Sequence, residues 1–203
     1  SYHALRRLIG ILGLLLPFLC WGVNGLVNHF DLLNNPGFVD ASQSLPYKPD
    51  GSLKSSISHF YYTAAGPLFT GILITVAVFL FCYNGYPLSK KDDRFAWLTD
   101  KRLTVFAAVC ALGIVIFPTS SETKITDNIH TYVSSHGAGI AHFIFAALFF
   151  LAMAVLSIIN FRRQPGKKVL SGPKSKLFLV CGWGMIACLV LLFIYSIVPY
   201  SAV

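Results

Sequence analysis

The chain alternates between long apolar runs and short polar segments. Each of the five apolar runs is almost free of charged residues, and stretches rich in Lys, Arg, Asn, Pro or Gly separate them. A helix of about 20 apolar residues is long enough to cross the hydrocarbon core of a bilayer. The pattern therefore predicts five transmembrane helices, over residues 8–28, 59–83, 101–118, 138–161 and 177–198.

The composition supports this interpretation. Hydrophobic residues make up 55% of the 203 residues and charged residues 12%, whereas a soluble domain carries about 25% charged residues. No linker divides the chain. We therefore expect an all-α integral membrane protein in which residues 1–203 form one domain, a bundle of five transmembrane helices.

The basic residues are shared unevenly among the polar segments. The N-terminus and the second and fourth loops hold 13 of the 16 Lys and Arg residues. Loops rich in Lys and Arg stay in the cytoplasm, so we expect a cytoplasmic N-terminus and an extracytoplasmic C-terminus. The net charge of +8 is thus explained by loops, and it does not indicate a nucleic-acid partner.

The first apolar run has some features of a signal peptide, because two arginines precede it. However, the run is long, lacks an A-x-A cleavage site and ends in a polar edge formed by Asn24, Asn28 and His29, which we expect to be wet. We therefore expect a retained helix.

The five cysteines all lie inside or beside apolar runs, and no two form a CxxC pair. Such cysteines are typical of small packing residues rather than of a disulfide framework or a thiol oxidoreductase.

Histidines give the clearest chemical signal. His130, His136 and His142 lie within thirteen residues, and His142 falls inside an apolar run. With the predicted orientation, His29 and His59 share their extracytoplasmic side. A titratable group in a hydrophobic helix is costly unless it is satisfied, so such a group marks a candidate site. Singly, these histidines could also be interfacial anchors with a polar tip in water.

We expect a polar site that binds a ligand through side chains near the start of the second and fourth spans. The ligand-binding candidates are His59, Tyr61, Tyr62, His136 and His142. An imidazole and phenol cluster beside apolar helices suits a lipid or an amphiphilic small molecule.

A metal site is an alternative for three of these residues, His59, His136 and His142, and zinc is the metal that such ligands suit. His136 and His142 are six residues apart, which on one helix separates them by about 240° around the axis. One helix therefore cannot easily offer both to one ion, and His59 would have to contribute from elsewhere. No cofactor is certain.

Catalytic candidates are Asp31, Asp127 and Ser55. The two aspartates flank the histidines and could orient an imidazole, although turn formation explains them equally well. The aspartates that alternate with basic residues are interpreted as solvated counter-charges: Asp92, Asp93 and Asp100.

Three stretches resemble small bacterial inner-membrane proteins grouped as domain of unknown function 998. They are SISHFYYTAAGPLFTGILITVAVFLFCYNGY (56–86), ALGIVIFPTSS (111–121) and H-x-x-x-A-A-L-F-F (142–150). The chain departs from the family's pattern at Ala65 and Gly66 or Pro67, where members often carry an Arg-Asp pair. The resemblance implies a polytopic protein of the bacterial inner membrane and no established activity.

A weaker similarity is to the membrane hydrolases that include the alkaline ceramidases. Ser55-x-x-x-His59 fits the first part of their signature, but the late His-x-x-x-His pair is absent. Those proteins also have seven spans, whereas five are predicted here.

Together these observations predict an inner-membrane protein whose extracytoplasmic polar site binds a membrane lipid or an amphiphilic small molecule. Two alternatives remain open. One is a zinc-dependent membrane hydrolase, such as a lipid amidase or esterase, and the other is an accessory subunit of a membrane complex.

Overall fold

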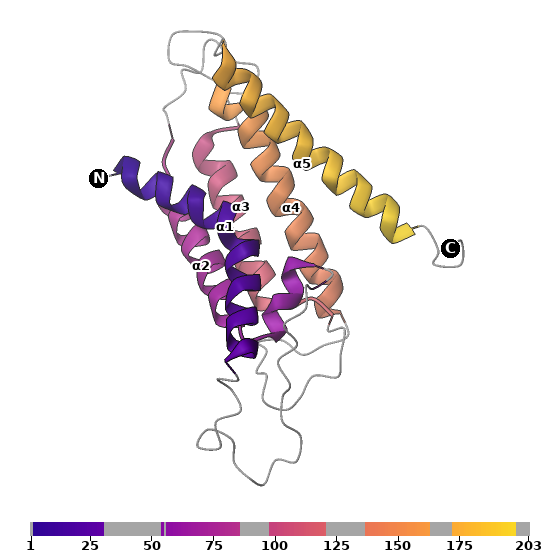
Figure 1. Ribbon diagram of the computed structural model, residues 1–203. Helices are drawn as coiled ribbons and strands as arrows, with labels where there is room; N and C mark the ends of the chain where they lie inside the picture. The colour runs from indigo at the N-terminus through magenta and orange to yellow at the C-terminus, as the bar shows by residue number, and fades with distance from the viewer. Residues whose placement is uncertain are drawn as a thin grey trace. The chain divides into compact units, whose positions relative to one another are not determined.

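The computed structural model describes residues 2–30, 54, 56–85, 98–120, 137–162 and 172–197. Within these ranges every regular element is helical (Figure 1). The predicted all-α class is therefore confirmed. The α-helices are α1 (Tyr2–His29), α2 (Gly66–Cys82), α3 (Asp100–Ile116), α4 (Ala138–Ile158) and α5 (Pro173–Ile197), and the short 3-10 helices are η1 (Ile57–Tyr62) and η2 (Asn160–Arg162).

Three of the described helices are long and apolar enough to cross a membrane. Their candidate spans are Arg7–Val27, Ala138–Arg162 and Pro173–Tyr195, and α2 is a shorter apolar helix. A membrane protein is the class of protein that this set of helices indicates.

The second apolar helix begins later than residue 59, where the sequence places its start. Ser56 caps η1 by accepting a hydrogen bond from the Ser58 N–H at 3.3 Å. Thr63 then ends η1 in an extended conformation. Pro67 occupies the first turn of α2, where a missing N–H leaves no helical hydrogen bond unmade. The polar residues before Gly66 therefore form a separate short helix.

The chain packs into two compact units, whose boundaries fall inside α2, α3 and α4. Unit 1 contains residues 1–76 and 113–142, and unit 2 contains residues 77–112 and 143–203.

In unit 1, α1 packs against η1 (Figure 1). Leu16, Cys20 and Asn24 are all buried, and their spacing of four residues places them on one face of the helix. Asn24 is fully buried, so the expectation that it lies at a wet edge was wrong. Asn24 is thus buried within unit 1, whereas His29 and Phe30 at the end of the helix are exposed.

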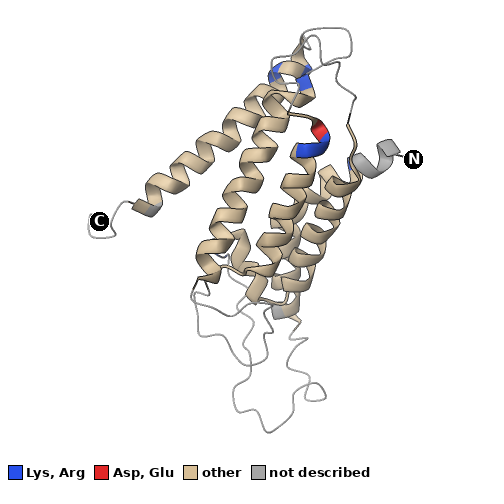
Figure 2. Cartoon of the chain, turned by 180° about the vertical axis from the view of Figure 1, so that it is seen from behind, with Lys and Arg blue, Asp and Glu red and all other residues tan. Residues whose placement is uncertain are grey.

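In unit 2, charged residues occur at the start of α3, at η2 and at the start of α5 (Figure 2). Asn160 in η2 donates hydrogen bonds to Leu98 and Asp100, and Arg162 donates one to Ser175. These three helix ends therefore lie at one end of unit 2. Their adjoining segments are the two loops in which the sequence concentrates Lys and Arg.

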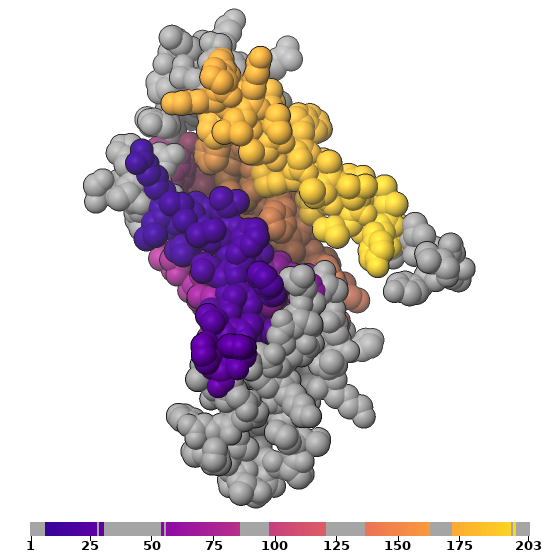
Figure 3. Space-filling model, in the orientation of Figure 1, coloured from indigo at the N-terminus to yellow at the C-terminus, as the bar shows by residue number. Residues whose placement is uncertain are grey.

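Helix α5 contacts the rest of unit 2 mainly near its start. Ser157 donates a hydrogen bond to the Phe178 carbonyl at 2.8 Å, and the rings of Phe161 and Phe178 lie 5.6 Å apart. Farther along α5, Gly182 lies against Ile158 and Ala154 of α4, whereas many other side chains are exposed (Figure 3). Val180 is 70% exposed and Phe193 67% exposed. An apolar surface of this kind suits lipid rather than water.

Candidate functional site

Unit 1 joins η1, the segment after α3 and the start of α4 through a connected set of polar groups. We call this set the His142 site and define it by Ser58, Tyr62, Phe117, Thr119 and His142. Because its members come from three separated parts of the chain, only the folded structure assembles it.

His142 lies in the second turn of α4 and is only 2% exposed. Its Nδ1 atom is 2.8 Å from the carbonyl oxygen of Phe117. Its Nε2 atom is 2.9 Å from the hydroxyl oxygen of Ser58. Both ring nitrogens are therefore satisfied, as the burial of an imidazole among apolar helices requires.

The two partners determine where the proton sits on the neutral ring. A carbonyl oxygen can only accept, so Nδ1 must carry the hydrogen and donate it to Phe117. Nε2 then has a lone pair and accepts the hydrogen of the Ser58 hydroxyl. The Ser58 hydroxyl thus lies beside a base, the His142 ring. The Phe117 carbonyl is the third group, which orients this ring.

The Phe117 carbonyl is available because α3 ends there. Phe117 donates its own N–H to Gly113 at 2.9 Å, and Pro118 then prevents the helix from continuing. The last carbonyls of a helix have no partner within the helix. His142 satisfies one of these carbonyls from the start of α4.

A second bond ties η1 to the same segment. The Tyr62 hydroxyl donates to the Thr119 carbonyl at 2.6 Å. Tyr62 precedes α2, and burial raises the pKa of its phenol, with a further upward contribution from neighbouring Tyr61. The two rings meet edge to face, with centroids 5.2 Å apart. Tyr62 therefore remains a protonated donor at neutral pH.

The first turn of α4 approaches the segment after α3 closely. A Cβ atom on Gly139 would overlap the Ser120 hydroxyl oxygen. A glycine at this position thus lets Ser120 lie against the helix, three residues before His142. The close approach helps to bring the Phe117 carbonyl within reach of the imidazole.

The structure places four of the predicted ligand-binding residues in or beside this site. His142 and Tyr62 belong to it, and buried Tyr61 contacts the Tyr62 ring. His59 follows Ser58 in η1 and lies close enough to His142 to interact with it electrostatically. His136, Ser55, Asp31 and Asp127 lie outside the described residues.

The predicted zinc ligands remain untested as a set, because His136 is outside the described ranges. Within those ranges no group of three or more His, Cys, Asp or Glu side chains is arranged to hold a metal ion. His142 could bind a metal through Nε2 only by giving up the Ser58 hydroxyl, since Nδ1 carries the proton. In the observed arrangement Nε2 is therefore occupied by the Ser58 hydroxyl.

Ser58 contributes a polar side chain to the site, and it was not selected as a candidate from the sequence. It is separated from His142 by 84 positions, and it lies in a run of similar serines in which Ser55 had the more suggestive spacing. No local pattern distinguishes Ser58 from its neighbours. Only the packing of η1 against the start of α4 identifies it.

A second polar group, the Asn160 cluster, lies in unit 2 and consists of Leu98, Asp100 and Asn160. Asn160 is 4% exposed and donates through Nδ2 to the Asp100 carboxylate at 2.7 Å and to the Leu98 carbonyl at 3.1 Å. Asp100 is 6% exposed. The interpretation of Asp100 as a solvated counter-charge was therefore wrong, because helix packing buries it beside an amide donor.

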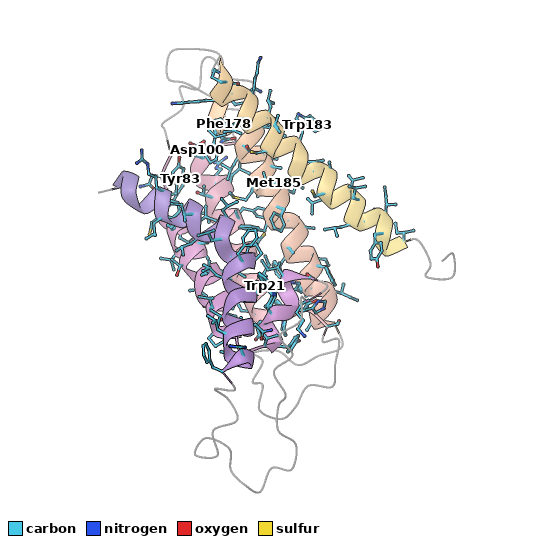
Figure 4. The ribbon with its side chains drawn as sticks, in the orientation of Figure 1. Trp21, Tyr83, Asp100, Phe178, Trp183 and Met185 are labelled. Atoms are coloured by element: carbon cyan, nitrogen blue, oxygen red, sulfur yellow. The ribbon has the colours of Figure 1, made fainter. Side chains whose placement is uncertain are left out.

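Further hydrogen bonds beside the Asn160 cluster link the end of α2 to the start of α3 (Figure 4). Lys101 donates through Nζ to the Phe81 carbonyl, and Thr104 donates through Oγ1 to the Tyr83 carbonyl at 3.4 Å. Gly85 has φ +66° and passes directly against Asp100. These contacts satisfy carbonyls at the end of α2, so they explain the polar residues as caps.

The chain matches no protein-family model, no curated protein and no solved structure. The two family resemblances therefore stay predictions. Function has to be argued from the His142 site itself.

Proposed function

We propose that this chain is a multi-pass inner-membrane protein that binds the polar end of a lipid or another amphiphile at the His142 site. The observation that carries the proposal is the Ser58–His142 hydrogen bond. It links the buried imidazole of His142, near the start of α4, to the hydroxyl of half-buried Ser58 in η1.

The membrane arrangement belongs to the same proposal. Five spans with a cytoplasmic N-terminus follow from hydropathy and from the distribution of Lys and Arg. The bonds that join the starts of α3 and α5 to η2 support it, because these ends adjoin the two basic loops. The partners would be membrane lipids, and the basic loops give no reason to propose nucleic acid.

The chemistry of the site suits a group that both donates and accepts hydrogen bonds. Ser58 gives its hydrogen to His142, so the lone pairs of its oxygen remain to accept a bond from a ligand. A hydroxyl or amide N–H near the headgroup of an amphiphile would meet that need. The acyl chains would lie against exposed apolar helix surface, where lipid is the natural solvent.

Lipid retention tests the proposal. The full chain, purified in a mild detergent, should carry a bound amphiphile that native mass spectrometry detects and solvent extraction identifies. We expect Ser58→Ala to lower the bound fraction about tenfold, since a lost hydrogen bond is worth about 1–1.5 kcal/mol.

The matched control is Ser157→Ala, which removes the serine hydrogen bond to Phe178 in unit 2. It should retain the amphiphile at the wild-type level. Wild-type protein that carries none, or equal loss in both variants, would contradict the proposal.

A zinc-dependent hydrolase and an accessory subunit are the alternatives. The zinc form would require His142 to exchange its Ser58 bond for a metal. Metal analysis of protein incubated with zinc separates it from the first proposal. Stoichiometric zinc that His142→Gln removes would favour the metal form.

A further inference from the structure

We infer that Ser58 is a nucleophile and His142 its general base, so that the His142 site cleaves a carboxylic ester or amide of an amphiphile without a metal. The inference rests on the proposed function, because its substrate is the amphiphile bound there. It adds a reaction and a covalent intermediate to a binding site.

The geometry meets the two requirements of an activated serine. The hydroxyl must lie within about 2.6–3.2 Å of the base, and another group must orient the base. Ser58 Oγ is 2.9 Å from Nε2, and the Phe117 carbonyl holds Nδ1 at 2.8 Å. This carbonyl also fixes the tautomer in which Nε2 is free to take a proton.

The acceptor distinguishes Ser58 from other hydroxyls in the described part of the chain. Several of these donate to backbone carbonyls, which cannot take up a proton at neutral pH: Thr63, Thr70, Thr75, Thr104 and Ser157. Ser58 donates to an imidazole lone pair, which can. A purely structural link needs no titratable acceptor, whereas proton removal from a nucleophile does.

The reaction balances with water as the second reactant. Ser58 Oγ attacks the acyl carbon while its proton passes to Nε2, and the C–O or C–N bond then breaks. The departing alcohol or amine takes the proton from Nε2, which leaves an ester on Ser58. Water attacks this ester, its proton passes through Nε2 to Ser58 Oγ, and a carboxylic acid is released. The Phe117 carbonyl stabilises the imidazolium in both halves.

Burial supports the assignment of roles. His142 is shielded almost completely, whereas Ser58 is partly exposed. The imidazole is therefore shielded from bulk water, and Ser58 is the more exposed of the two partners. In a site of low dielectric constant the attraction between the forming charges is stronger than in water.

A fluorophosphonate, which forms a covalent bond with activated serines, tests the inference directly. The full chain in lipid nanodiscs is incubated with the probe, digested and mapped by mass spectrometry. We expect the adduct on Ser58 and none in Ser58→Ala. The control Ser157→Ala removes a hydroxyl in unit 2 that donates to the Phe178 carbonyl, and it should be labelled at the wild-type rate.

His142→Gln tests the base. General-base catalysis contributes about 100-fold or more, so labelling of a monodisperse His142→Gln protein should fall at least that far. In the wild type, acid should slow labelling because it protonates the imidazole. The remaining labelling of His142→Gln should not show this decrease at low pH. Mapping of the wild-type adduct needs no variant, so misfolding of His142→Gln would not remove the test.

The outcomes separate this inference from the proposed function. Wild-type protein that retains an amphiphile but shows no adduct on Ser58 would overturn nucleophilic catalysis and leave binding intact. An adduct that forms equally fast without the imidazole would do the same. An adduct on protein that never retains an amphiphile would support the nucleophile while contradicting the proposed function.

Discussion

The His142 site and the Asn160 cluster are two polar contacts made near the two ends of α4, and they differ in what they can do with a proton. In the first, an imidazole accepts from a hydroxyl and donates to a carbonyl. In the second, an amide donates to a carbonyl and to a carboxylate. Both link buried polar groups, but only the first contains an imidazole, the side chain whose ordinary pKa lies closest to neutral pH.

This difference separates a reactive site from a structural one. Asn160 holds the start of α3 against the end of α4, and Lys101 and Thr104 cap α2 beside it. Every role there is explained by helix ends that need partners. At the His142 site the Phe117 carbonyl also needs a hydrogen-bond donor. The imidazole that donates to it also faces the Ser58 hydroxyl. Burial of a polar group therefore does not by itself indicate function, and the identity of its partners does.

The largest expected effect tests whether the two regions differ in reactivity. His142→Gln should lower fluorophosphonate labelling of Ser58 about 100-fold or more, because it removes the base. Asn160→Ala should leave the labelling rate of the folded fraction unchanged, because its amide contacts only Leu98 and Asp100 through described hydrogen bonds. Equal losses in the two variants, measured by gel fluorescence on monodisperse protein, would mean that the two regions do not differ as proposed.

At the Asn160 cluster we expect a substitution to lower the stability of the protein rather than the rate of labelling. Asn160→Leu leaves the buried Asp100 carboxylate without its amide donor, and hydrogen bonds to charged groups are worth about 1.5–3 kcal/mol. We expect thermal unfolding in detergent to show a destabilisation of about 2–3 kcal/mol. Asp100→Asn in the Asn160→Leu background should recover part of this loss, because it removes the stranded charge. Unchanged stability in Asn160→Leu would contradict the burial of the pair.

Substitution of two glycines, one beside each polar group, gives a further comparison of the two regions. Gly85→Ala places a methyl group against Asp100 at a positive φ, and such strain costs about 1–3 kcal/mol. Gly139→Ala meets the end of the Ser120 side chain in an ordinary helical conformation, so we expect a loss below about 1 kcal/mol because the side chain can rotate. Calorimetry or thermal melts should rank the two variants in this order, and the reverse order would contradict it.

A comparably small effect is expected at Tyr62. Tyr62→Phe removes one hydrogen bond to the Thr119 carbonyl, which is worth about 1 kcal/mol. Because folding raises the pKa of this phenol, its contribution is complete below the unfolded pKa near 10 and decreases as pH rises toward the folded pKa. Urea or thermal unfolding of the two proteins should therefore differ at pH 7 and converge at strongly alkaline pH. A difference that grows with pH would have the wrong sign.

The sequence analysis was most accurate where a property depends on consecutive residues. The long apolar runs predicted helices over 8–28, 138–161 and 177–198, and α1, α4 and α5 cover them almost completely. It was least accurate at polar residues beside those runs. The second apolar helix begins at Gly66 rather than at residue 59, since Ser56 and Thr63 delimit a short helix before it.

The candidate site could be anticipated only in part. His142 was identifiable because a histidine within an apolar run demands a partner, and Tyr62 because aromatic residues favour helix ends near lipid. Ser58 was not selected and Asp100 was misjudged, for a common reason. A serine among serines and an aspartate among lysines look solvated until the fold places another element over them.

What the amino-acid sequence determined by itself is therefore the helical, membrane-type character of the chain, because hydropathy and helix length are sums over neighbouring residues. The tertiary structure alone decided that Ser58 meets His142 across 84 positions and that Asn160 covers Asp100. Such pairings depend on which helix ends pack together. A hydrogen bond between distant residues leaves no periodicity in the chain that a reader of the sequence could detect.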